Sequence, residues 1–190
     1  MNKENTETLF NTFPEFFNHK DDIKNSLMMF GFGCNDGWYN LIYDLCTDIR
    51  EWFIRNESNH LMGFDEEKDR YIIEIKTGIP PQFQVQQVKE KFGGLRFYIS
   101  AAPQEVHNMI HKAEAESYTI CEHCGKKCIQ KKGESYKSFY RDDLGWILTL
   151  CDECLNKHLK SKGLDKGQSL ENDYISKWQK KHNAPFIGGD

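Results

Sequence analysis

Cysteines are the residues of this 190-residue chain whose spacing most clearly suits a chemical role. Four of the seven form two C-x-x-C pairs, Cys121 with Cys124 and Cys151 with Cys154. Both thiolates of such a pair can reach one tetrahedral ion from a tight turn, and the glycine after Cys124 permits the positive φ of that turn. The spacing therefore predicts one zinc ion per chain, held by these four cysteines.

The expected zinc is structural. Four thiolates fill a tetrahedral coordination sphere, which leaves no position for a reactive water. Cys128, His123 and His158 lie close to the pairs in the sequence and are alternative ligands. An iron–sulfur cluster fits this spacing less well than zinc.

The segment that carries the cysteines predicts a module over residues 118–160. A hairpin is expected between the pairs, over 136–150, and the second pair begins a helix with the sequence CDECLNKHLK. A knuckle, a hairpin and a helix that provides the last two ligands follow one another in a treble-clef zinc finger. The positive end of the helix, together with the ion, is expected to lower the pKa of its cysteines.

The helices that position this module are predicted from apolar spacing. Apolar residues recur three and four apart between Trp38 and Phe53, which indicates a long helix over about 37–55, with Asp36 as its N-cap. A shorter helix is expected over 14–30, ending at Gly31. Another is expected over about 103–117, with Pro103 at its first turn.

Strands are predicted over about 70–100, where the apolar period changes to two. We expect strands near 71–76, 83–91 and 95–99 to form a three-stranded antiparallel meander, with a register slip at Gln86–Gln87 and a turn at Gly93–Gly94. The sequence thus predicts an α+β body over 1–117 in which helices pack on a small antiparallel sheet. The treble-clef-like zinc module follows, and then a tail over 161–190 with a short helix.

Charge and composition exclude several classes of protein. The net charge of −4 argues against a strongly basic nucleic-acid coat, although 12 basic and 19 acidic residues in 1–120 (−7) contrast with 13 and 10 in 121–190 (+3). The sequence contains no long apolar run and no signal peptide at its N-terminus. We therefore expect a cytoplasmic protein, in which the thiols stay reduced, with no membrane partner.

No residue pattern indicates catalysis. The sequence contains no serine in a nucleophile elbow, no zinc-protease helix motif and no carboxylate pair that the spacing places together. Cys34 and Cys46 stand apart from the other cysteines, and Cys46 falls beside the apolar stripe, where a buried thiol is the default. The prediction is a non-enzymatic protein.

The segment VQQVKEKFGGLRFYI combines cations with aromatic residues. Lys89, Lys91 and Arg96 alternate with aromatic side chains there, a pattern that can bind phosphates and stack bases. The same pattern also fits an ordinary half-buried strand. The candidate nucleic-acid contacts are completed by lysines of the zinc module, Lys126, Lys127, Lys131 and Lys132.

Several stretches together resemble an uncharacterised family that is common in phages and prophages. They are GWYNLI at 37–42, QVKEKFGGLRFY at 87–98, AEAES at 113–117, the C-x-x-C-G knuckle, and GWILTLCDEC at 145–154. The likeness spans about residues 30–158 and implies a small accessory protein of a mobile genetic element.

On this basis we expect the protein to inhibit a host nuclease defence such as a CRISPR effector. Its partner would be the effector protein or ribonucleoprotein, bound in the host cytoplasm. The alternative is a nucleic-acid-binding regulator that uses the basic, aromatic hairpin and the zinc module. Experiments that offer both kinds of partner distinguish these hypotheses.

Overall fold

The protein has an α+β architecture, as predicted. Its computed structural model describes residues 1–56, 58–65, 70–77, 80, 83–128, 139–141 and 147–161. The elements in chain order are α1 (Lys3–Thr12), the 3₁₀ helices η1 (Met28–Phe30) and η2 (Asp36–Trp38), α2 (Tyr39–Asn56), β1 (Ser58–Asp65), β2 (Arg70–Thr77), β3 (Val85–Lys91), β4 (Gly94–Ile99), α3 (Gln104–Ser117), β5 (Phe139–Arg141), β6 (Ile147–Thr149) and α4 (Asp152–Ser161). The expected tail helix lies outside the described residues.

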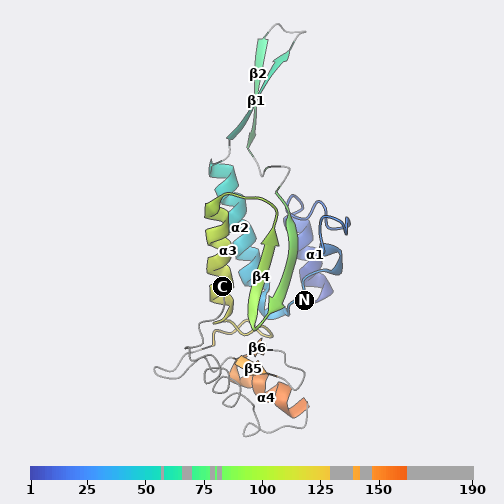
Figure 1. Ribbon diagram of the computed structural model, residues 1–190, viewed down its shortest axis with the longest axis vertical. Coiled ribbons are helices and arrows are strands. Elements are labelled where there is room, and N and C mark those ends of the chain that lie inside the picture. The colour runs from blue at the N-terminus through green and yellow to red at the C-terminus, as the bar shows by residue number, and fades with distance from the viewer. Residues whose placement is uncertain are drawn as a thin grey trace, which may run out of the picture.

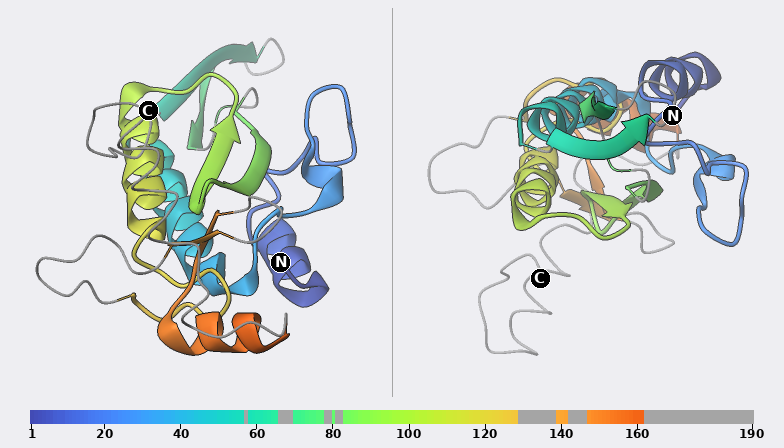
Figure 2. Two further views of the ribbon diagram at one scale, coloured as in Figure 1. Left: turned by 60° about the horizontal axis from the view of Figure 1, so that its bottom comes forward. Right: turned by 90° about the horizontal axis from the view of Figure 1, so that it is seen from above.

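The elements form an elongated molecule. In Figure 1, α2 and α3 lie side by side next to the β3–β4 hairpin, and α1 lies on the other side of that hairpin. The β1–β2 ribbon extends from one end of this body, whereas β5, β6 and α4 lie at the opposite end. Figure 2 shows the same arrangement from below and from above.

The N-terminal region differs from the expected helix over 14–30. The helix is α1, where the Asn2 side chain accepts a hydrogen bond from Asn5 N at 2.8 Å, and Pro14 follows directly after Phe13. Proline disfavours a helical conformation in the residue before it, so Pro14 ends α1 at Phe13, and residues 14–27 form turns and bends. The predicted end of helical structure at Gly31 is confirmed, because η1 ends there and Gly31 adopts a φ of 72°.

The long helix is confirmed as α2, and its apolar stripe is buried. Asp36 does not cap it, because that carboxylate instead accepts hydrogen bonds from Asn2 N at 2.8 Å and Asn5 Nδ2 at 3.0 Å. Asp36 therefore ties the start of α1 to the start of α2. The buried residues of α2 are Leu41, Ile42, Leu45, Cys46, Ile49 and Phe53.

The predicted three-stranded meander is wrong. β2 pairs with β1, a strand that precedes the range 70–100 in which strands were predicted, whereas β3 pairs with β4 in a second two-stranded sheet. The Pro80–Pro81 pair lies between the two sheets in sequence. Proline cannot donate a ladder hydrogen bond, so this segment does not continue the pairing from β2 to β3.

The β3–β4 hairpin shows the predicted slip but a different turn. The register shifts between Val85 and Gln87, which is the signature of a β-bulge at the paired glutamines. The turn residues are Phe92 and Gly93, with φ of 56° and 78°, rather than Gly93 and Gly94. Gly94 begins β4 instead, and a Cβ at this position would lie 2.4 Å from the Tyr118 ring, which favours glycine there.

One face of this hairpin packs on the core, and both of its edges are occupied. Along β3, Leu27 N donates to Gln86 O at 2.8 Å and Gly33 N donates to Val88 O at 2.9 Å. Along β4, Leu95 N donates to Ser117 Oγ of α3 at 2.9 Å. Because neither edge is open, the opposite face of the hairpin is the surface that remains for binding.

The main core joins α1, α2, the β3–β4 hairpin and α3. Phe83 lies at its centre, where its ring meets Phe16 at 5.1 Å and Phe53 at 5.0 Å between centroids, both edge to face. Such pairs add about 0.5–1.5 kcal/mol each to the stabilisation from burial. Within the described part of the chain, no helix has the length and apolar character needed to cross a bilayer.

Candidate functional site

The first cysteine pair lies in a tight knuckle between α3 and the β5–β6 hairpin. Cys121 N donates to Lys126 O, and Gly125 N donates to Cys121 O, both at 2.9 Å. Gly125 has a φ of 74°, so the glycine predicted from the sequence is the residue that allows this turn. Cys128 N donates to Thr119 O at 2.7 Å and closes the base of the knuckle.

The second pair is presented by α4. β5 and β6 pair antiparallel, with Tyr140 opposite Leu148, and β6 ends two residues before Cys151. Leu155 N donates to Cys151 O at 2.8 Å, so the helical hydrogen bonding of α4 begins at this cysteine. Cys154 lies one turn further along the same helix.

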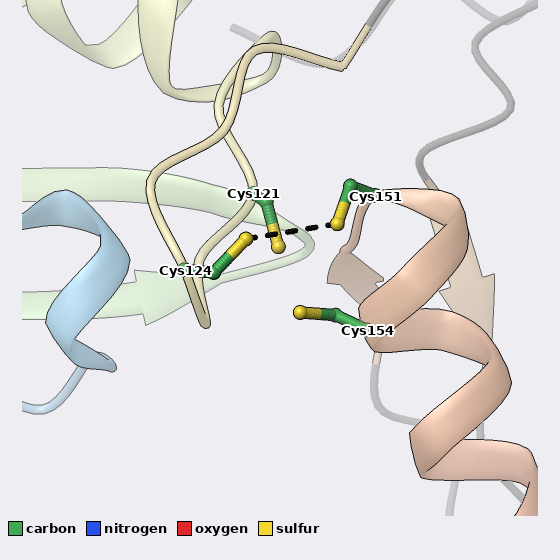
Figure 3. Close-up of side chains that lie close together, drawn as sticks. All are labelled: Cys121, Cys124, Cys151 and Cys154. Carbon is green, nitrogen blue, oxygen red and sulfur yellow. Dashed lines mark hydrogen bonds between the residues drawn. The ribbon is translucent and has the colours of Figure 1, made fainter.

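All four predicted thiols converge (Figure 3). The four Sγ atoms lie within 4.8 Å of one another, and the Sγ atoms of Cys124 and Cys151 are 3.6 Å apart. Thiolates on a tetrahedral ion with bonds of about 2.3 Å are separated by about 3.8 Å. A disulfide requires about 2.05 Å, so the observed spacing fits a metal site and not a covalent bridge.

The electrostatics of the four thiols favour a cation. Burial raises the pKa of Cys121, and burial together with the neighbouring thiols raises the pKa of Cys154. Burial acts in the same direction on Cys124, but the backbone N–H of Lys126 and the other thiols outweigh it and lower the pKa of Cys124. The helix end alone therefore does not lower the pKa of Cys154. A cation bound at this site would stabilise the thiolates and release their protons.

The other three cysteines do not join the group. Cys128 is half-buried, and burial raises its pKa to about 12. Cys34 and Cys46 are buried in the main core, where burial raises the pKa of Cys34 to about 12 and that of Cys46 as well. In the described residues, the four cysteines are the single group of three or more potential ligands close enough to share an ion.

The knuckle is also attached to the start of α2, which the sequence did not indicate. Gly37 N donates to Glu122 O at 2.7 Å, and Trp38 Nε1 donates to Ile120 O at 3.0 Å. A Cβ at Gly37 would lie 2.2 Å from Cys121 O. Only glycine allows the backbone at position 37 to come this close to the knuckle. The two hydrogen bonds therefore join the predicted α+β body, residues 1–117, to the module that follows it.

Glu122, between the two cysteines of the knuckle, strengthens this attachment. Its side chain is 2% exposed and accepts hydrogen bonds from Asn35 N at 3.0 Å and Asn35 Nδ2 at 2.9 Å. Burial raises the pKa of this carboxyl, although the bonds from Asn35 oppose the shift. The signal available in the sequence was the glutamate inside the knuckle, together with the glycine-rich stretch before α2.

The outer face of the β3–β4 hairpin gathers the cations predicted for it. Lys89 is opposite Arg96 in the register, and Lys91 lies two residues beyond Lys89, so all three share one face. Leu95 and Phe97 point to the core on the other face, where both are buried. None of the three cations forms an ion pair with a carboxylate of the described residues.

Two exposed aromatic residues complete this outer face. Tyr98 is 40% exposed, and Lys89 Nζ lies 5.4 Å from the centre of its ring. Phe92, at the hairpin turn, is 64% exposed and lies 5.3 Å from Lys91 Nζ. Of the three aromatic residues in the segment VQQVKEKFGGLRFYI, Phe97 is buried, so two of them lie with the cations as predicted.

The lysines predicted in the zinc module are placed differently. Lys126 forms an ion pair with Glu153 of α4 and is therefore partly neutralised, whereas Lys127 is exposed on the knuckle. Lys131 and Lys132 lie outside the described residues.

Thr149 Oγ1 donates to Gly93 O at 2.5 Å, so the turn of the β3–β4 hairpin touches β6 of the module.

Comparison of the chain with protein-family models, with curated proteins and with solved structures finds no match.

Proposed function

We propose that the protein is a non-enzymatic binding protein stabilised by one structural zinc ion. Support comes from the four thiols, which offer a complete tetrahedral sphere with no open position. The order of knuckle, β5–β6 hairpin and α4 supports assignment of the module to the treble-clef zinc fingers. In this role the ion holds the knuckle against Asn35, Gly37 and Trp38, and so stabilises the body as well as the module.

The binding function supported best is recognition of single-stranded nucleic acid by the outer face of the β3–β4 hairpin. The observation that carries this proposal is the presence of three cations, without carboxylate partners in the described chain, on one face with two exposed aromatic rings. Cations neutralise phosphates, and aromatic rings stack on unpaired bases. A regulator that binds nucleic acid through this face needs no catalytic group.

Fluorescence anisotropy with labelled single-stranded and duplex DNA and RNA tests this function. Three phosphate contacts on a single strand predict a slope of about −2 in log K against log salt, which is a loss of about 20-fold between 0.05 and 0.2 M. Reversing Lys91 and Arg96 to glutamate should weaken binding at least tenfold and flatten the slope. Lys112→Glu on α3 is the matched control for charge.

A second candidate is inhibition of a host nuclease defence by contact with the effector protein. The resemblance to a phage family supports a mobile-element origin, and the host cytoplasm would then be the site of action. Exposed apolar side chains in the segment 23–30, which ends with η1, support a protein contact. They are Ile23, Leu27, Met29 and Phe30, which are 57%, 42%, 49% and 71% exposed.

Purified CRISPR effectors, each with and without its guide RNA, distinguish the two functions. An inhibitor binds an effector, and Phe30→Ser weakens that complex while Lys91→Glu with Arg96→Glu does not. A nucleic-acid binder gives the opposite pattern on free oligonucleotides. Salt-sensitive binding of bare single strands that is lost on charge reversal favours the regulator over the inhibitor.

A further inference from the structure

A pocket of about 350 Å³ lies beside the outer face of the β3–β4 hairpin. One wall is the segment before η1, which contributes Ile23 and Leu27, and the other wall is Gln86, Gln87 and Tyr98 of the hairpin. Leu27 N donates to Gln86 O at 2.8 Å, so a backbone hydrogen bond joins the two walls. The volume falls in the range of small-ligand sites.

Two polar side chains of the lining, Gln86 and Gln87, have no hydrogen-bond partner in the described chain, whereas Asn25 and Ser26 donate to Asp22 Oδ2 and Val85 O. The β-bulge leaves Gln86 without a ladder partner while Gln87 pairs with Tyr98, and both glutamines line the pocket. In a regular strand, consecutive residues point to opposite faces, so the bulge is what brings both amides to one site. Neither side-chain amide hydrogen-bonds to a described residue, which leaves each with a donor and an acceptor for a ligand.

Tyr98 joins this pocket to the cationic face. Tyr98 lines the pocket, and the centre of its ring lies 5.4 Å from Lys89 Nζ. Lys89 is opposite Arg96 in the sheet. Lys24 adds another positive side chain at the pocket wall. A ligand in the pocket is therefore next to a row of cations that extends along the hairpin, an arrangement that suits a polyanion.

The turn of the hairpin carries a further indication. Phe92 holds a φ of 56°, a left-handed conformation that is strained for a non-glycine residue, and its ring is 64% exposed. Asparagine is the residue preferred at this position of a two-residue turn. A strained, exposed aromatic ring is consistent with a stacking surface at the end of the cationic row opposite Tyr98.

We infer that this pocket accepts one unstacked adenine base of a single strand that runs along the outer face of the hairpin. A glutamine amide matches the adenine edge, because its oxygen accepts from N6 and its nitrogen donates to N7. Tyr98 and Ile23 then cover the faces of the base. The inference rests on the proposed nucleic-acid function and adds base selectivity to it, with the strand phosphates held by Lys89, Lys91 and Arg96.

The test uses the full chain and two labelled DNA single strands of 11 nucleotides. One is oligo(dT), and the other is the same strand with one central dA. Anisotropy should show at least about fivefold tighter binding of the strand with dA, since a bidentate amide–base pair discriminates by about 1–3 kcal/mol. Gln86→Leu with Gln87→Leu should abolish this preference and leave the affinity for oligo(dT) unchanged within about twofold. Gln104→Leu on α3 is the matched control and should retain the preference.

The outcomes separate the pocket from the underlying function. Equal affinity of the wild-type protein for the two strands overturns the adenine pocket while the nucleic-acid function stands. A preference that survives the double glutamine substitution also overturns it. Failure to bind either strand at about 0.05 M salt overturns the proposed nucleic-acid function and the pocket together.

Discussion

Substitution of Gly37 by alanine probes the contact between the metal centre and the body. The added Cβ would lie 2.2 Å from Cys121 O and 2.5 Å from Glu122 O. Both atoms belong to the backbone of the knuckle, which is held by its own hydrogen bonds and by the cysteines. The knuckle and the start of α2 must therefore separate.

The cost follows from the bonds lost on separation. Gly37 N to Glu122 O and Trp38 Nε1 to Ile120 O are neutral hydrogen bonds of 2.7 and 3.0 Å, and the Glu122 carboxylate accepts two more from Asn35. Each of the two neutral bonds contributes about 1 kcal/mol, and the two bonds to the charged Glu122 carboxylate together contribute about 2 kcal/mol. The free energy of unfolding therefore falls by about 4 kcal/mol. For a chain of this size, that lowers Tm by roughly 8–16 °C.

Calorimetry and zinc competition measure this effect. Scanning calorimetry of the zinc-loaded protein should show the lower Tm, and titration against a chromophoric chelator should show weaker zinc binding. Asn40→Ala, at an exposed position in the first turn of α2, is the control and should change neither quantity. A Gly37→Ala protein that melts within about 2 °C of wild type with unchanged zinc affinity would refute the coupling.

Three other variants test separate parts of the structure. Elemental analysis should find one zinc per chain, and Cys121→Ser with Cys151→Ser should remove more than half of it; retention of the metal would contradict the ligand assignment. Phe92→Asn relieves the left-handed strain and should stabilise the protein by about 1 kcal/mol in urea unfolding while weakening single-strand binding; a loss of stability would contradict the strain argument. Burial raises the pKa of Glu90, so the folded protein keeps the proton on this carboxyl at pH values at which the unfolded chain has lost it. The folded state therefore loses stability as the pH rises from the unfolded pKa through the folded pKa. Glu90→Gln keeps the acceptor for Gly93 N and should be more stable than wild type at pH 7 but not at pH 4, and equal stability of the two proteins at both pH values would exclude the burial penalty.

Local features of the sequence were sufficient to predict several elements and the four cysteines that cluster. The apolar stripe of α2 and the alternation along β4 depend on neighbouring residues, because a helix or strand repeats its faces every few positions. Each C-x-x-C pair places two thiols on one tight turn. Because a tetrahedral ion needs four ligands, the sequence predicted that the two pairs come together, and the four thiols do lie close to one another. The register slip at Gln86–Gln87 was visible as a break in the alternation.

Tertiary structure decided the features that join distant segments. β2 pairs with β1 rather than β3, and Gly37 meets the knuckle 84 positions along the chain at Cys121. The pocket likewise needs Ile23 and Gln87 from separate parts of the sequence. Periodicity indicates which face of an element is apolar, but not which other element covers it, because strand pairing and close backbone approach depend on how the whole chain packs.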